Sequence, residues 1–181
     1  RHRGRDAEAA LMPSIGSDGI TTFGVVPEDR RLLGVSVGQL AQHLDGRFVS
    51  GEDGSDVLVE HLMVGGMGMD PGEYYFGIHD SKAVIVRGDR PDLQMAALKT
   101  STACIVMTKG IEPIEYVQYE AREEEVPVIV VETDTLGTME ALNGLMDSAR
   151  FDHPLKLARY SELADEHIDL LALHDALGLA G

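Results

Sequence analysis

Four short segments of the chain combine glycine with charged or hydroxyl-bearing residues, and they carry the chemistry that the sequence offers. Glycine reaches backbone conformations with positive φ, which let a turn approach a ligand closely. Arginine, lysine and threonine side chains donate hydrogen bonds to anions. The residues concerned are Gly65, Gly66, Gly88, Asp89, Arg90, Asp92, Thr108, Lys109, Gly110, Asp134 and Thr135. This set predicts a binding site for a small anionic metabolite or a nucleotide, and we assign no residue to catalysis.

These segments follow apolar runs that are typical of parallel β-strands. The runs "AVIVR", "ACIVMT" and "VPVIVVET" are nearly continuous in apolar residues, as in strands that are covered on both faces. The expected strands and helices alternate as 83–87, 91–99, 103–108, 113–124, 128–132 and 138–148. Right-handed crossovers bring every βα loop to one edge of the sheet. Ligands bind at that edge in α/β proteins, and helix N-termini there favour anions.

Each candidate residue also has a purely structural interpretation, which the sequence leaves open. Asp89 has the residue type of an N-cap for the helix that follows it. Arg90 has two candidate partners for an internal ion pair, Asp92 and Asp134. Lys109 fits a solvated loop as well as an anion site, and the glycines fit turns without a ligand.

Other elements are predicted from caps and apolar periodicity. Ser36 and Gln39 have the spacing of a capping box, and Gly46 stands where a C′ glycine ends a helix. Asp70 is expected to begin another helix, which has a proline in its first turn. A short strand is predicted over 22–26, and two C-terminal helices over 155–165 and 170–177.

The composition indicates an acidic cytoplasmic protein. Fifteen lysines and arginines against 31 aspartates and glutamates give a net charge of −16, which disfavours binding to nucleic acid or to an anionic membrane. Neither a membrane span nor a signal peptide is expected. The single cysteine, Cys104, lies in an apolar run and is predicted to be an inert core residue. A salt-loving host is an alternative explanation of the charge.

Sequence signatures of several common reactions are absent. The chain has no GxxxxGK[ST] phosphate loop, no HExxH pair and no GxSxG elbow, and its histidines are scattered. We therefore expect a domain that is not an enzyme and has no resident cofactor or metal. The chain does not begin with methionine, and we expect it to be part of a longer protein.

Two long stretches resemble the DRTGG domain family. They are "VRGDRPDLQMAALKTSTACIVMTKGIEP" and "EEEVPVIVVETDTLGTMEALNGLM". The segment "GITTFGVVPEDRRLLGVSVGQLAQHLDG" is similar to the junction at which a dethiobiotin-synthetase-like P-loop domain leads into a DRTGG domain. The tail "HPLKLARYSELADEHIDL" is similar to the C-terminal helices of that family. DRTGG domains occur in phosphotransacetylases, in stand-alone proteins with such a P-loop domain, and beside CBS domains.

The resemblance implies an architecture and a division of the chain. The implied fold is a three-layer α/β/α arrangement with a mainly parallel sheet, similar to the N-terminal domain of HPr kinase/phosphorylase, with C-terminal helices added. Residues 32–148 would form the DRTGG domain. Residues 1–31 would be the remnant of a preceding P-loop domain, and residues 149–181 would be a helical tail.

The resemblance also gives the candidate turns their family equivalents. The GDR turn maps to Gly88, Asp89 and Arg90, and the TGG turn maps to Thr108, Lys109 and Gly110. Lys109 departs from the family glycine. If that position needs a positive φ, the lysine is strained. If it does not, the lysine adds a cation to an anion site.

Three functions are compatible with these features. The first is a regulatory, ligand-sensing domain of a phosphotransacetylase-like protein. The second is a dimerisation or assembly module without a ligand. The third is a metal-dependent phosphoesterase that uses Asp89 or Asp134. The expected partners are a second copy of the chain and an adjacent P-loop or acetyltransferase domain in the parent protein.

Overall fold

The computed structural model describes residues 21–66 and 72–179 of the chain. Two compact units are present among the described residues: one lies within residues 33–150, and residues 21–32 together with 151–179 belong to the other.

A five-stranded sheet forms the centre of the unit 33–150. Its strands are β2 (Arg47–Ser50), β4 (His61–Gly65), β5 (Lys82–Arg87), β6 (Thr102–Thr108) and β7 (Val128–Val130). They lie in the order β2-β7-β6-β5-β4. Strands β4 to β7 are parallel, and β2 pairs antiparallel with β7 at one edge. The predicted mainly parallel sheet is thus confirmed, with one antiparallel edge strand added.

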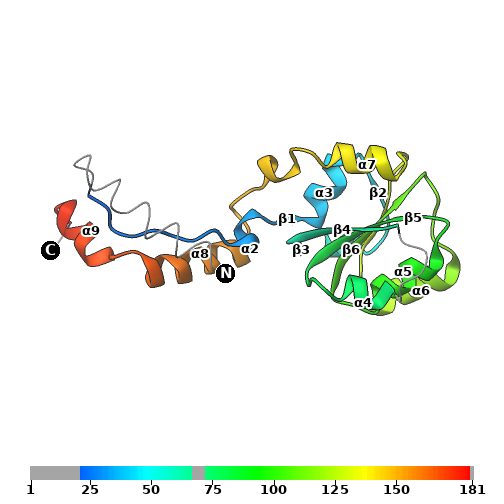
Figure 1. Ribbon diagram of the computed structural model, residues 1–181, viewed down its shortest axis with the longest axis horizontal. Coiled ribbons are helices and arrows are strands. Elements are labelled where there is room, and N and C mark those ends of the chain that lie inside the picture. Colours follow the sequence, from blue (N-terminus) through cyan, green and yellow to red (C-terminus); the bar gives the residue numbers. More distant parts are fainter. Residues whose placement is uncertain (1–20, 67–71, 180–181) are drawn as a thin grey trace. The chain divides into compact units, whose positions relative to one another are not determined.

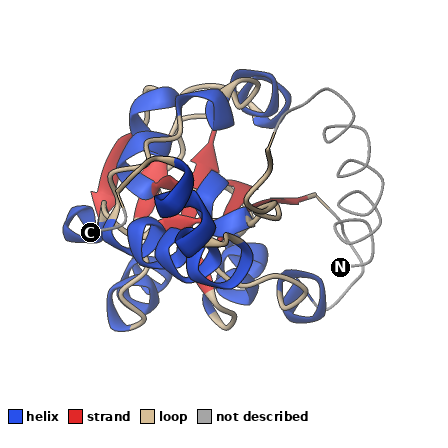
Figure 2. Ribbon diagram, turned by 90° about the vertical axis from the view of Figure 1, so that its left-hand side faces the viewer, coloured by secondary structure: helices blue, strands red, loops and turns tan. Residues whose placement is uncertain are grey.

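Helices cover both faces of this sheet (Figure 1). The helices α4 (Gly72–Phe76), α5 (Pro91–Leu98) and α6 (Glu115–Glu123) lie on one face, and α3 (Val37–His43) and α7 (Thr135–Ala141) lie on the other. Consecutive parallel strands are neighbours here, so right-handed crossovers place their three helices on the same face. Figure 2 shows the strands in red among the blue helices. The three-layer α/β/α prediction is confirmed.

The central strands are apolar throughout because each of their two faces meets a separate hydrophobic cluster. Ala83 and Ile85 belong to the cluster on the α3 side, while Val84 and Val86 belong to the cluster on the α5 side. All four side chains are fully buried. Cys104 is equally buried, and burial raises the pKa of its thiol to about 12, so the prediction of an inert core cysteine is confirmed.

The N-terminus of α3 matches the sequence prediction, and its C-terminus does not. Ser36 and Gln39 form the expected capping box. At the other terminus, the left-handed residue is Asp45 (φ 50°) and not Gly46, so the C′ assignment was wrong. The amide of Gly46 closes the turn by donating to the carbonyl of Ala41 at 2.8 Å. Glycine is required there because a Cβ would lie 2.5 Å from Cγ2 of Ile129.

Several other boundaries differ from the predictions. The helix predicted over 138–148 starts earlier, as α7, because Asp134 caps it through the amide of Gly137. It stops before Gly144, whose φ of +79° precedes the short 3-10 helix Leu145–Ser148. The segment 22–26 contains only a single bridge, between Gly24 and Ile168. The start predicted at Asp70 lies outside the described residues.

Further short elements accompany the five-stranded sheet. Strands β1 (Val35–Ser36) and β3 (Leu58–Val59) pair with each other. A 3-10 helix, η1 (Glu52–Gly54), lies between β2 and β3. The helix α2 (Arg30–Leu33) precedes β1.

The other unit contains the two predicted tail helices, α8 (Pro154–His167) and α9 (Leu170–Ala176). Asp169 caps α9, and its amide donates to the carbonyl of Phe23 at 2.7 Å. Arg159 of α8 pairs with Asp29. Within the ranges 21–66 and 72–179, the helices are too short or too polar to cross a membrane.

Candidate functional site

The predicted site residues lie along the edge of the sheet at which the parallel strands end. Because β4 to β7 are parallel, the loops that follow them all emerge at this edge. Adjacent loops touch. Gly88, which follows β5, packs so closely on the next loop that a Cβ would lie 2.3 Å from the carbonyl oxygen of Ile111. The amide of Lys109 donates to the carbonyl of Thr133 at 2.8 Å.

A change of direction between β6 and β7 distinguishes one part of this edge. After β6 the chain continues to α6 on one face of the sheet, and after β7 it continues to α7 on the other face (Figure 1). Loops that diverge from neighbouring parallel strands define the place where α/β sheets bind ligands. We call this place the β6–β7 junction, defined by residues 108–110 and 132–135.

Hydrogen bonds join the two loops of the β6–β7 junction. The amide of Gly110 donates to the carbonyl of Val131 at 2.9 Å. The hydroxyl oxygens of Thr108 and Thr135 lie 3.3 Å apart. Thr108 is fully buried, so its hydroxyl contacts the second loop from within the protein and not from the solvent side. The structure therefore brings the predicted residues of these two loops together.

Lys109 has a left-handed backbone, with φ of +71°, and Gly110 follows with φ of +64°. Lys109 therefore departs from the TGG pattern at a position with a positive φ, where a lysine is strained, and the strained residue still carries its charge. A residue with a Cβ pays about 1–2 kcal/mol for that conformation. The side chain of Lys109 is exposed and makes no ion pair with any residue in the ranges 21–66 and 72–179.

Asp89 does not cap helix α5, so that prediction was wrong. The N-cap is Arg90, whose side chain makes no capping hydrogen bond. The carboxylate of Asp89 instead pairs with the guanidinium of Arg87, with Nε and Oδ1 2.8 Å apart. This hydrogen bond lowers the pKa of Asp89, and the charge of Lys109 acts in the same direction.

Arg90 forms its ion pair with Asp92 and not with Asp134. Nε and Nη2 of Arg90 donate to the two carboxylate oxygens at 2.8 and 2.6 Å, a bidentate geometry. The hydrogen bond lowers the pKa of Asp92. Asp134 caps α7. Because Arg90 already holds a carboxylate, an incoming anion has to compete with Asp92 for it.

Gln94 is a residue at this edge that the sequence analysis missed. Its side chain is fully buried, and its Nε2 donates to the carbonyls of Arg87 and Gly88 at 2.9 and 3.0 Å. Gln94 thus holds the GDR turn against helix α5. The available signal was a glutamine within the apolar run "LQMAAL".

The two glycines after β4 have different surroundings. Gly65 is buried, and a Cβ there would lie 2.5 Å from Cγ1 of Val86, so packing alone explains its residue type. Gly66 has no atom within 4 Å of the position of a Cβ.

The fold and the edge together define an α/β domain of three layers with its loops gathered beyond the carboxyl ends of parallel strands. Residues 39–145 match the DRTGG domain, and the chain therefore belongs to the DRTGG family. A similar solved structure is that of the CBS and DRTGG domains of the regulatory region of Clostridium perfringens pyrophosphatase, in complex with its activator diadenosine tetraphosphate. The identity is 14%, the TM-score is 0.51, and the match covers 80% of this chain and 70% of the other. That likeness shows a shared fold.

Proposed function

We propose that this chain is a non-catalytic regulatory domain that senses an anionic metabolite or a nucleotide at the β6–β7 junction. The observation that carries the proposal is Lys109. A glycine would relieve the cost of the left-handed backbone. The lysine instead places an exposed cation, without an ion-pair partner in the described residues, where neighbouring loops diverge.

Arg90 supplies a second cation to the same site in this proposal. Arg90 forms a bidentate pair with Asp92, and 62% of the Asp92 side chain is exposed to solvent. Exposed pairs of this kind contribute about 0–1 kcal/mol, so a phosphate can displace the carboxylate at little cost. A phosphate also accepts the same two parallel hydrogen bonds from a guanidinium.

The related structure supports a regulatory role, since it shows a DRTGG domain within the regulatory region of a pyrophosphatase, in complex with a nucleotide activator. We further propose that the parent of this chain is phosphotransacetylase-like. In that parent, residues 1–31 would end a P-loop domain, residues 32–148 would form the DRTGG domain, and residues 149–181 would lead onward. The support is the "GVVPED" junction and the pattern of the tail.

A thermal-shift screen of the purified chain tests the sensing function. The panel contains ATP, ADP, AMP, diadenosine tetraphosphate, acetyl-CoA, acetyl phosphate and phosphoenolpyruvate, because a ligand that binds only the folded state raises Tm. We expect at least one shift that is lost in Lys109→Ala and in Arg90→Ala. Asp92→Asn, which frees Arg90, should strengthen binding.

Lys99→Ala is the matched control, because Lys99 is an exposed lysine of the same unit that pairs with Glu73 away from the junction. A ligand whose shift is equally reduced by Lys99→Ala would indicate general charge attraction. The absence of a shift from every compound, or a shift that persists in Lys109→Ala, would contradict the proposal.

An assembly module remains the second candidate, and exposed apolar residues of the tail favour it. Leu155, Leu157 and Leu171 have 54%, 50% and 79% of their surface exposed. A homodimer would cover such residues. Sedimentation of the chain at several concentrations tests this candidate, and a monomer at all of them would exclude it.

The phosphoesterase alternative gains no support, since no group of three metal-ligating side chains occurs in the described residues.

A further inference from the structure

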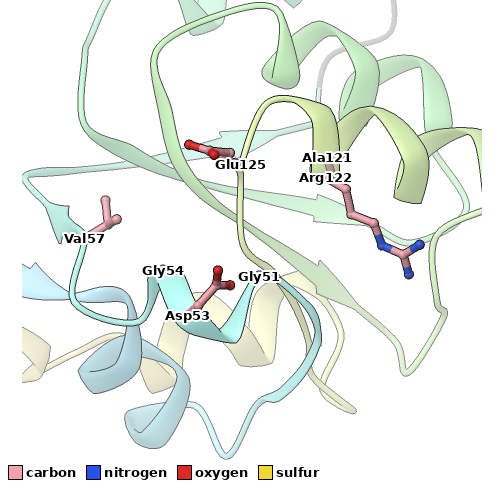
Figure 3. Close-up of a pocket in the computed structure, with 7 residues that line it drawn as sticks. All are labelled: Gly51, Asp53, Gly54, Val57, Ala121, Arg122 and Glu125. Carbon is pink, nitrogen blue, oxygen red and sulfur yellow. The ribbon is translucent and has the colours of Figure 1, made fainter.

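The edge of the sheet at which the parallel strands begin has a pocket of about 460 Å³ beside η1 (Figure 3). Ser50, the last residue of β2, pairs with Val128, the first residue of β7, so the segments next to them meet there. The lining residues are Gly51, Asp53, Gly54, Val57, Ala121, Arg122 and Glu125. Figure 3 shows the guanidinium of Arg122 extending away from the two carboxylates of this lining. Nothing among these residues indicates a ligand, whereas the β6–β7 junction, at the opposite edge, combines a cation with an acid.

The acid of the β6–β7 junction is Glu132, whose carboxylate lies against Gly110. A Cβ on Gly110 would lie 2.6 Å from Oε2 and 3.2 Å from Oε1 of Glu132. Gly110 has φ of +64°, so the residue type that this turn favours is also the one that leaves room for the carboxylate. Glu132 is exposed and makes no hydrogen bond or ion pair within the described residues. Both of its oxygens are therefore free to accept hydrogen bonds from a ligand.

The ammonium of Lys109 serves the other side of this turn, toward the loop after β5. The hydrogen bond from Arg87 lowers the pKa of Asp89, and the charge of Lys109 lowers it further, so Lys109 acts on that loop. Lys109 and Glu132 form no ion pair with each other. Because β6 lies between β5 and β7, the cation and the acid stand toward opposite neighbours of β6. A ligand that contacts both has to reach across about one to two strand spacings, roughly 5–10 Å.

A buried acceptor at the same edge of the sheet also lacks a donor. Gln94 is fully buried, and its Nε2 donates to the carbonyls of Arg87 and Gly88. Its Oε1 accepts no hydrogen bond within the described residues. Because Nε2 and Oε1 belong to one amide group, Oε1 also lies at the GDR turn. A buried acceptor without a donor is costly, so this edge calls for a donor from outside the described residues, independently of the exposed charges.

Glu132 stands at the place where nucleotide-binding βαβ units have an acid. Strand β6, helix α6 and strand β7 follow one another, and the two strands are parallel neighbours. In dinucleotide-binding units of this order, the turn after the first strand holds phosphate, and an acid roughly 20 residues further on accepts a hydrogen bond from a ribose hydroxyl. Gly110 and Glu132 occupy these two places. The turn lacks the GxGxxG fingerprint, and Lys109 supplies the charge for a phosphate instead.

We propose that the ligand of the β6–β7 junction is a phosphate ester that also carries a vicinal diol, with its phosphate at Lys109 and its two hydroxyls donating to Glu132. This inference rests on the proposed sensing function and names the ligand class of the same site. A carboxylate repels a bare anion, so acetyl phosphate and phosphoenolpyruvate, which have no hydroxyl donors, fit the junction poorly. The diol can be the ribose of a nucleotide or part of a free sugar phosphate.

Matched pairs of compounds test the diol while the phosphate charge stays constant. We would titrate the chain by calorimetry, at constant ionic strength, with AMP, ADP and ATP and with the 2′-deoxy counterpart of each. Ribose 5-phosphate and 2-deoxyribose 5-phosphate test the free sugar in the same way. We expect the member with the diol to bind about tenfold more tightly, because hydrogen bonds to a carboxylate are charge-assisted and strong.

Variants of Glu132 assign the preference to this carboxylate. Glu132→Gln should weaken the diol compound by about tenfold and leave the deoxy compound unchanged or slightly tighter, because a repulsive charge is lost. Glu132→Asp keeps the charge but withdraws the carboxylate from Gly110, so it should also reduce the preference. The control is Glu140→Gln, which removes the same charge from an exposed position of α7 outside the junction. It should change the binding of either compound by less than about twofold.

The outcomes separate this inference from the sensing function. A diol preference among the nucleotides alone would assign the diol to a nucleotide, and ribose 5-phosphate binding as tightly as AMP would assign it to a free sugar phosphate. Equal binding of diol and deoxy compounds, lost in Lys109→Ala, would overturn the inference and leave the sensing function standing. A preference that persists in Glu132→Gln would overturn it as well. If no diol compound bound, the inference would fall, and the sensing function would fall with it only if the other anions of the thermal-shift panel also gave no shift.

Discussion

Replacing Lys109 by glycine should stabilise the DRTGG domain although it removes a charged side chain from the candidate site. The left-handed backbone of Lys109 costs about 1–2 kcal/mol with a Cβ present. Glycine avoids that cost but loses about 0.4–1 kcal/mol through the greater freedom of the unfolded chain. The two ranges differ by about 0.8 kcal/mol at their midpoints, so we expect a gain of about that size in the free energy of unfolding.

The backbone contacts of this residue survive the substitution. The amide of Lys109 donates to the carbonyl of Thr133 at 2.8 Å, and glycine keeps that amide. The side chain is exposed and makes no ion pair within the described part of the chain, so its removal should cost little. For a domain of this size, the gain corresponds to a rise in Tm of about 2–5 °C.

The assay is thermal and urea unfolding of Lys109→Gly, Lys109→Ala and the unchanged chain. Lys109→Ala removes the same charge but keeps the Cβ, so its stability should stay within about 0.5 kcal/mol of the unchanged chain. Lys99→Gly, at a position with φ of −76°, should lower stability by about 0.5–1 kcal/mol. If Lys109→Gly were no more stable than Lys109→Ala, the strain argument and the support that it gives to the proposed site would both fail.

Three further predictions follow from other parts of the structure. Gly46→Ala should lower the free energy of unfolding by about 1–3 kcal/mol, because the new Cβ would overlap Ile129; urea unfolding measures this. Cys104 should resist a thiol reagent at pH 8 until the chain unfolds, since it is buried with a pKa of about 12; rapid labelling of the native chain would contradict this. Burial is the largest single influence on Asp29 and raises its pKa, but the hydrogen bonds from Arg159 and from the amide of Arg31, together with the charges of these two arginines, outweigh burial, so the pKa is lowered. The ion pair should therefore stabilise the chain above the ordinary aspartate pKa and be lost as pH falls through the lowered value, and Asp29→Asn should flatten Tm measured by circular dichroism between about pH 2 and 5.

Several features of this domain were readable from local sequence patterns. Continuous apolar runs predicted the parallel strands, because a strand covered on both faces needs apolar residues at every position. The spacing of Ser36 and Gln39 predicted the start of α3, because a capping box involves only neighbouring residues. The quoted motifs predicted the DRTGG family, which the match over residues 39–145 confirms.

Other features depended on contacts between distant segments, which no local pattern encodes. The positive φ of Lys109 goes with its bond to Thr133, a residue that follows another strand. The pocket beside η1 exists because the antiparallel edge strand β2 brings residues near 50 beside those near 125. Local residue types determine which elements form, whereas the pairing of strands far apart in sequence determines which side chains meet.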